Sequence, residues 1–263
     1  MTRVLRSPRW LLGHVLVVAI CLAFVNLGLW QVRRLEDRLL QNIVMANRLS
    51  TPPAPIGELV AGAGSDIDSL EYRNATAVGT FDTLEEVLVR SQVHRGSAGW
   101  HVLTPLILGD GRAVMVNRGW IPLEMDSVPV AAAPPSGQVT VPGWVSLTRV
   151  RRSGGALEPE GRLTQIARVD LARLQEQMPF ELLPVYLVSD LSGTPLPVAL
   201  ERPDVMDEGP HLVYAIEWFS FALIGVVGYF FLVRRAVRRS AFRDDGGGPG
   251  QTVDDGDVAK SVQ

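Results

Sequence analysis

WLLGHVLVVAICLAFVNLGLW, from Trp10 to Trp30, contains no Asp, Glu, Lys or Arg. A helix needs about 20 apolar residues to cross the hydrocarbon core of a bilayer. A second stretch, HLVYAIEWFSFALIGVVGYFFLV from His211 to Val233, meets the same requirement. Glu217 is its one Asp, Glu, Lys or Arg. The two stretches therefore predict two transmembrane helices, over residues 10–30 and 211–233.

The first stretch has an alternative interpretation as a secretory signal, because Arg3, Arg6 and Arg9 resemble a basic leader region. A cleaved signal has an apolar run of roughly 7–15 residues and a small-residue cleavage site. This run is longer and ends near Trp30 without such a site. We therefore expect an uncleaved anchor.

Arginine positions predict the orientation, because cytoplasmic flanks of membrane helices carry the excess of Arg and Lys. The terminal sides of the two stretches are richer in arginine than the loop sides. This bias predicts a multi-pass protein with residues 1–9 and 234–263 cytoplasmic and residues 31–210 outside. We expect the membrane to be the plasma membrane of a bacterium. The terminal-side arginines are Arg3, Arg6, Arg9, Arg234, Arg235, Arg238, Arg239 and Arg243, and those of the loop sides are Arg33, Arg34, Arg38, Arg48 and Arg202.

Residues 31–210 change pattern along their length. Gln31 to Leu49 has apolar residues at helical spacing, and Pro52, Pro53 and Pro55 then break it. Short β-branched segments follow, which predict a mostly antiparallel sheet with a hairpin turn at Gly109-Asp110-Gly111. The candidate strands are 73–81, 86–91, 100–108, 113–118, 139–147, 163–169 and 184–189, with a short helix after the N-cap Asp170.

The predicted fold is thus a membrane α-helical hairpin with an inserted β-rich α+β domain outside the cytoplasm. The tail from Ser240 is rich in Gly and Asp and is expected to be disordered. The net charge of −3 gives no basic surface for nucleic acid. Cys21 is the only cysteine, which excludes a metal site built from several thiolates.

The outer segment shows no recognisable catalytic constellation of nucleophile, base or metal ligands. Its carboxylate pairs are interpreted as solvated loop charges, and His94 and His101 as unrelated side chains, with a joint metal site as the alternative. The carboxylate pairs are Asp66 and Asp68, Glu85 and Glu86, and Glu158 and Glu160.

Histidines inside the predicted spans are more informative, because ionisable groups are costly there. His14 lies near the cytoplasmic end and is interpreted as an interfacial side chain. His211, Tyr214, Ala215 and Trp218 form one stripe on the second helix. The stripe fits two functions: an interfacial aromatic belt, or an imidazole above aromatic rings that could hold a flat, apolar, iron-bearing ligand.

Four sequence blocks resemble the Surfeit locus family, whose members assist cytochrome c oxidase assembly. They cover most of the chain in the expected order. Glu217 departs from the family pattern, in which a neutral residue is usual. The blocks are Gly28-Leu29-Trp30-Gln31 with Arg34; Tyr72-Arg73, Gly79-Thr80-Phe81-Asp82 and Val87-Leu88-Val89; residues 99–106, Asp110-Gly111 and 116–122; and His211-Leu212, Tyr214-Ala215 and Trp218-Phe219.

The resemblance implies a non-enzymatic chaperone of the respiratory chain that helps haem a reach, or stay in, the catalytic subunit of the oxidase. It implies that His211 is the iron ligand. The haem would then lie between Trp30 and Trp218, beside Tyr214, with Arg34 or Arg33 near its propionates.

The exposed cluster expected at Arg118 and Trp120 could contact the oxidase. The alternative is a folding role, in which Gly119 supplies a backbone angle and Trp120 fills the core. Two other functions remain for the whole chain: a two-span structural or regulatory protein without haem, and a membrane haem enzyme.

Overall fold

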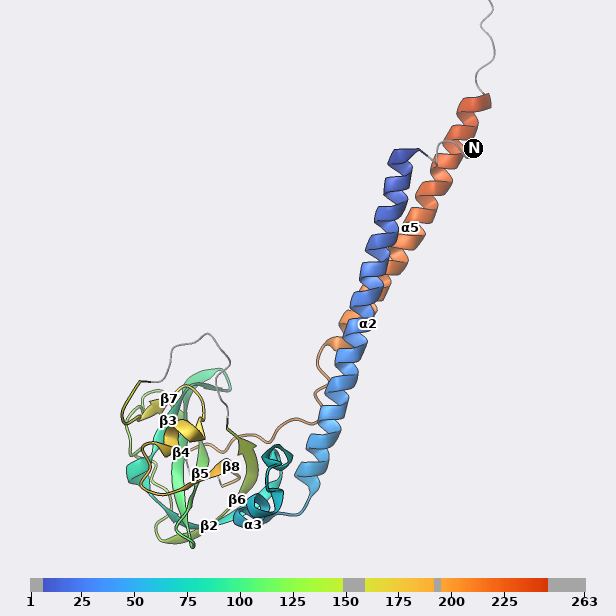
Figure 1. Cartoon of the computed structure of the whole chain (residues 1–263). Helices are drawn as coiled ribbons and strands as arrows, with labels where there is room; N and C mark the ends of the chain where they lie inside the picture. The colour runs from blue at the N-terminus through green and yellow to red at the C-terminus, as the bar shows by residue number, and fades with distance from the viewer. Residues whose placement is uncertain (1–6, 149–158, 192–194, 246–263) are drawn as a thin grey trace, which may run out of the picture. The chain divides into compact units, whose positions relative to one another are not determined.

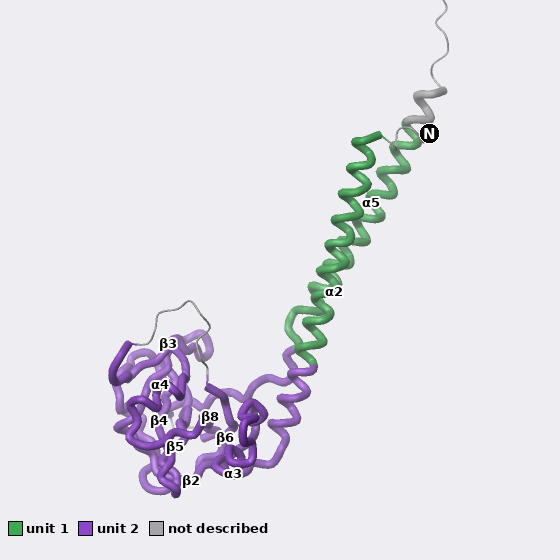
Figure 2. The backbone as a smooth tube through the Cα atoms, in the orientation of Figure 1, with its two compact units in different colours: residues 1–39, 208–263 green, residues 40–207 purple. Residues whose placement is uncertain are grey.

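The computed structural model describes residues 7–148, 159–191 and 195–245, the last six of these as backbone only. The chain divides into two compact units, one of residues 1–39 and 208–263 and the other of residues 40–207 (Figure 2). Arg3, Arg6, Glu158 and the tail beyond residue 245, which entered the sequence analysis, lie outside the described residues.

Helix α2 runs from Pro8 to Ser50 and is 43 residues long (Figure 1). Proline is favoured at the first helical position, where its missing N–H has no intrahelical partner. The helix stops before Pro52 and Pro53, which cannot continue it. The predicted span and the predicted helix after it are therefore one continuous element.

Helix α5 runs from His211 to Asp245. Residues 240–245, expected to belong to a disordered tail, are its last turns. Both α2 and α5 contain segments long and apolar enough to cross a membrane.

In the first unit α2 and α5 lie antiparallel and side by side (Figures 1 and 2). The less exposed residues of each helix recur at alternating spacings of three and four, the seam pattern of a left-handed coiled coil. Close packing depends on small residues: a Cβ added to Gly28 would lie 2.6 Å from the Phe219 ring. The seam residues are His14, Val17, Cys21, Phe24, Gly28 and Gln31 in α2, and His211, Ala215, Trp218, Ala222, Gly225 and Tyr229 in α5.

The second unit is β-rich. Its described residues form eight strands. Seven lie close to the predicted ones, several longer and one shorter, and the strand at residues 54–55 was not predicted. The eight strands are β1 (Ala54–Pro55), β2 (Asn74–Phe81), β3 (Val87–His94), β4 (Ser97–Leu108), β5 (Ala113–Pro122), β6 (Gln138–Leu147), β7 (Gln165–Ile166) and β8 (Leu182–Ser189). The short helices are α3 (Ile56–Ala63), η1 (Ile67–Leu70), η2 (Thr83–Glu85) and α4 (Leu171–Gln175).

The strands form one sheet in the order β1-β2-β6-β8-β5-β4-β3-β7. A further antiparallel pairing of β2 with β4 closes β2, β6, β8, β5 and β4 into a barrel. Most pairs are antiparallel, as predicted, and β1–β2, β3–β7 and β5–β8 are parallel. One buried cluster packs with α3 and η1, and another packs with α4 and the chain before it.

Two local predictions are confirmed. The Asp110 carboxylate accepts hydrogen bonds from the backbone and guanidinium of Arg112 in the β4–β5 turn, where Gly111 has φ +84°. The Asp170 side chain caps α4 by accepting from the Arg173 N–H at 3.2 Å.

Candidate functional site

His211 is the first residue of α5 and contacts Gln31 of α2. Its Nδ1 lies 3.0 Å from Gln31 Oε1. Gln31 is only 9% exposed, and it occupies the seam one helical step beyond Gly28. The close approach at Gly28 therefore brings the amide and the imidazole together at this end of the helix pair.

This hydrogen bond selects one tautomer of His211. An amide oxygen can only accept, so Nδ1 carries the proton and Nε2 keeps its lone pair. A histidine that donates from Nδ1 to a fixed acceptor is the usual arrangement of a metal-ligating imidazole. Gly209 lies beside this nitrogen, and a Cβ added there would be in van der Waals contact with the ring, 3.5 Å from Nε2. His211 can therefore offer a lone pair to a metal centre.

Aromatic rings from both helices lie further along the seam. Phe24 stacks on Trp218 with ring centroids 5.7 Å apart, and Phe221 lies 6.0 Å from Trp218. Trp30, Tyr214 and Arg34 are also within this end of the unit but are exposed, Trp30 by 51% and Tyr214 by 45%. The ring contacts of Trp218 thus go to Phe24 and Phe221, and Trp30 and Tyr214 lie on the outside of the seam.

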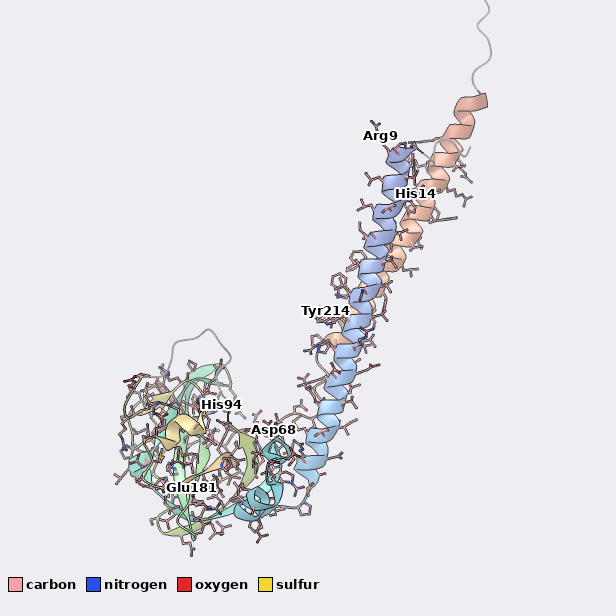
Figure 3. The ribbon with its side chains drawn as sticks, viewed as in Figure 1. Arg9, His14, Asp68, His94, Glu181 and Tyr214 are labelled. Atoms are coloured by element: carbon pink, nitrogen blue, oxygen red, sulfur yellow. The ribbon has the colours of Figure 1, made fainter. Side chains whose placement is uncertain are left out.

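His14 lies far along the helix pair from Tyr214 (Figure 3). Its Nδ1 hydrogen bonds with the Tyr229 hydroxyl, and its ring lies 5.9 Å from the Trp10 ring. His14 and His211 therefore have separate surroundings within the helix pair.

The β-rich unit has a cleft of about 830 Å³ that contains a third histidine. His101 lies there on β4, and Asn117 Nδ2 approaches its Nδ1 at 3.4 Å. Because Asn117 Oδ1 accepts from the Gly119 N–H, its nitrogen faces the imidazole and donates to it. His101 therefore carries its proton on Nε2, the opposite tautomer to His211, and does not present a lone pair to the cleft.

The buried His101 should make the stability of the β-rich unit depend on pH. Burial, with a smaller contribution from His94, lowers the pKa of His101 to about 4. An unfolded histidine titrates near 6.5, so protons bind the unfolded state first as the pH falls. We expect the unfolding free energy to be unaffected by His101 above pH 6.5 and to fall by about 2 kcal/mol between pH 7 and pH 5 through this residue.

Urea unfolding followed by tryptophan fluorescence at both pH values measures this loss. His101→Gln should flatten the pH dependence by about the same amount. An equal slope in the variant and in the wild type would show that His101 is not the group responsible.

Arg118 and Trp120 were expected to form an exposed cluster, and this expectation of exposure is wrong. They are 6% and 8% exposed. The register of β4 and β5 pairs Leu103 with Asn117 and Val102 with Gly119, so Arg118 is the extra residue of a β-bulge. The Arg118 guanidinium donates to Glu86 and to the Ala132 carbonyl and lies over the Phe81 ring. A contact between these residues and the oxidase stays untested.

Gly119 has the backbone role that the sequence analysis offered as the alternative. Its φ is +121°, and a Cβ there would lie 2.2 Å from the Val198 carbonyl oxygen. Trp120 pairs with Val198 through its backbone N–H and C=O. The Arg-Gly-Trp cluster is therefore part of the domain's packing.

Glu85 and Glu86 were interpreted as solvated loop charges, and both are buried, at 9% and 3% exposed. Glu86 Oε2 accepts from Arg118 Nη1 at 3.0 Å and from Thr104 Oγ1 at 2.6 Å. Glu85 pairs with Arg162 at 2.9 Å. The two glutamates were interpreted as loop charges because they lie at a predicted turn, and their partners Arg118 and Arg162 lie far along the chain. Asp66 and Asp68 are exposed, as expected.

Gln31 and Phe24 are the two site residues that the sequence reasoning did not single out. The sequence did contain a signal for these two residues, because both continue one heptad pattern of α2. The positions of this pattern are His14, Val17, Cys21, Phe24, Gly28 and Gln31. Gln31 is the only seam position among these with an amide side chain.

Comparison with known proteins identifies the family of this chain. The profile of the SURF1 family, the Surfeit locus family that the sequence resembles, matches residues 18–223. The chain belongs to the SURF1 family. The matched residues include Gln31 of α2 and His211, Ala215 and Trp218 of α5.

Relatives of this family member come from bacteria and eukaryotes. An uncharacterized SURF1-like protein of Mycobacterium tuberculosis is 27% identical over 93% of this chain and 90% of its own length. A SURF1-like protein of Monosiga brevicollis is 29% identical over 83% of this chain and 86% of its own length. The cytochrome oxidase assembly protein SHY1 of Saccharomyces cerevisiae is 29% identical over 62% of this chain and 44% of its own length.

Proposed function

We propose that this SURF1 family member is a membrane-anchored assembly factor for cytochrome c oxidase that binds haem a through His211 and assists its delivery to, or retention in, the catalytic subunit. Family membership and the name of the yeast relative support the assembly role. The observation that carries the haem proposal is the hydrogen bond between His211 Nδ1 and Gln31 Oε1, because it leaves Nε2 free for iron.

The residues of the helix pair suit such a cargo. A neutral imidazole is a common axial ligand of haem iron. Phe24, Trp218 and Phe221 give an apolar aromatic surface further along the same seam. The exposed guanidinium of Arg34 could pair with a propionate. The protein needs only to bind, shield and release the haem, so no chemical step is required of it.

The basic end of α5 supports a membrane orientation. Arg234, Arg235, Arg238 and Arg239 gather with Phe231 around one surface pocket at that end of the helix. Cytoplasmic flanks of membrane helices carry such excess arginine. We therefore place both termini in the cytoplasm and the β-rich unit outside the bacterial plasma membrane.

Topology can be tested with reporter fusions. A periplasm-active reporter fused within the loop at Gly137 should be active, and the same reporter at Gln263 should be silent. A cytoplasm-active reporter should give the reverse pattern. Fusions at both positions that report the same side would contradict a two-span protein.

The assembly role is tested by deletion of the gene from its own host. The membranes should lose most of their oxidase activity and haem a content, and the wild-type gene should restore both. Unchanged oxidase activity and haem a content in the deletion strain would contradict the proposed function.

A further inference from the structure

Glu217 lies on the outer surface of α5. The seam that faces α2 passes through Ala215 and Trp218, and Glu217 is exposed between them. In the part of the chain that the structure describes, no hydrogen bond or ion pair to the Glu217 side chain is found. Its surroundings on this surface are apolar and also exposed, with Val213 at 59% and Ile216 at 57%.

The level of Glu217 matters if the hairpin spans a membrane, as proposed above. Glu217 lies six residues from the start of α5, which is about 9 Å along the helix axis. Arg234, at the other end of the apolar run, is roughly 25 Å further on. With a hydrocarbon core about 30 Å thick, this carboxyl is within the apolar layer.

A second polar residue lies on the outside of the pair near this level. Asn26 is exposed on α2, and it falls between Phe24 and Gly28, which contact Trp218 and Phe219 of α5. Ser220 is also exposed, but its hydroxyl donates to the Ile216 carbonyl at 2.7 Å, so its donor is satisfied within the helix. Glu217 and Asn26 keep unused hydrogen-bonding capacity toward the bilayer.

Ionisable side chains within membrane spans almost always face protein or water and pair with a partner. We infer that the outer face of α5 around Glu217 is a docking surface for a transmembrane helix of the oxidase under assembly, which presents a hydrogen-bond donor to this carboxyl. The inference rests on the proposed function. The helix pair would then have two functional surfaces: the seam, which contains His211, and the outer face of α5, which binds the transmembrane helix of the oxidase.

A second copy of this chain suits the surface less well. A two-fold contact through this face would bring two Glu217 carboxyls together, which disfavours their ionisation. Asn26 could supply a donor, but it lies on the α2 surface that points away from α5. A contact of Asn26 with Glu217 of another copy would join two different surfaces of the chain. Such a heterologous contact generates rings or open filaments and not a two-fold dimer.

Capture of the oxidase tests the inference. Affinity-tagged full-length protein is purified from detergent-solubilised membranes, and the co-purified catalytic subunit is quantified by immunoblot relative to the bait. Glu217→Leu should reduce capture about tenfold, because an intramembrane hydrogen bond is lost. Leucine makes α5 more apolar, so insertion should not suffer. Ile224→Val, on the same face one heptad deeper, should capture as the wild type does.

Glu217→Gln identifies the donor, because glutamine still accepts a hydrogen bond. Capture retained by Gln and lost by Leu supports a neutral donor, and loss in both supports a cationic one. Capture by Glu217→Leu equal to the wild type, or no capture by the wild type itself, would overturn the inference. Haem absorbance of the same preparations reports separately on His211, so wild-type capture without haem would defeat haem binding alone.

Discussion

Replacing Glu86 with alanine should lower the unfolding free energy of the β-rich unit by about 3–5 kcal/mol, because it leaves Arg118 buried without its counter-charge. The carboxylate is held by Arg118, by Thr104 and by the Val130 N–H at 2.7 Å. Burial already lowers the pKa of Arg118, and Glu86 opposes that effect. After the substitution, the guanidinium would keep its hydrogen bond to the Ala132 carbonyl.

The neighbouring residue provides a matched control. Glu85 pairs with Arg162, whose side chain is 53% exposed, so Glu85→Ala should cost no more than about 1 kcal/mol. The double variant Glu86→Leu with Arg118→Met removes both charges and should recover much of the loss. Urea unfolding followed by tryptophan fluorescence measures all three. A Glu86→Ala protein within about 1 kcal/mol of the wild type would show that the buried pair is not needed for stability.

The elements of this fold could be predicted because they depend on local patterns. Apolar runs with at most one charged residue located α2 and α5, and alternation with turn residues located the strands. The Gly109-Asp110-Gly111 turn and the Asp170 cap each satisfy backbone groups a few residues away. Such signals lie within one short stretch of sequence.

The barrel and its buried charges could not be predicted in the same way. The barrel closes where Gly79 of β2 pairs with Leu108 of β4. This close approach requires glycine, because a Cβ on Gly79 would lie 2.2 Å from the Ile107 carbonyl oxygen. The bulge at Arg118 places two residues of β5 opposite one position of β4, which interrupts the regular register of the pair. Glu86 is buried because Arg118 and Val130 reach it from distant segments.

At the candidate site, the sequence located His211 but not its partner. Gln31 was visible only as part of a family block, and its role depends on the seam that brings α2 against α5. Trp30 was expected to lie level with His211, with a haem between Trp30 and Trp218. Level is set by the number of residues, whereas facing is set by helix rotation, and the seam places Trp30 on the outside.

His211→Ala should abolish haem absorbance while the protein still inserts in the membrane. The substitution removes the only nitrogen lone pair that the Gln31 contact makes available. Gln31→Leu should weaken binding about 10–100-fold without abolishing it, since it removes the acceptor that orients the imidazole. His14→Ala should leave the spectrum unchanged, because its hydrogen bond to Tyr229 places it near the opposite end of the pair.

The absorption spectrum of the full-length protein, purified in detergent from cells that make haem a, is the most direct measurement of this function. The account predicts a haem a spectrum at near one haem per chain in the wild type and in His14→Ala, a reduced spectrum in Gln31→Leu, and none in His211→Ala. A His211→Ala protein with the full wild-type haem content would contradict the assignment of His211 as the ligand.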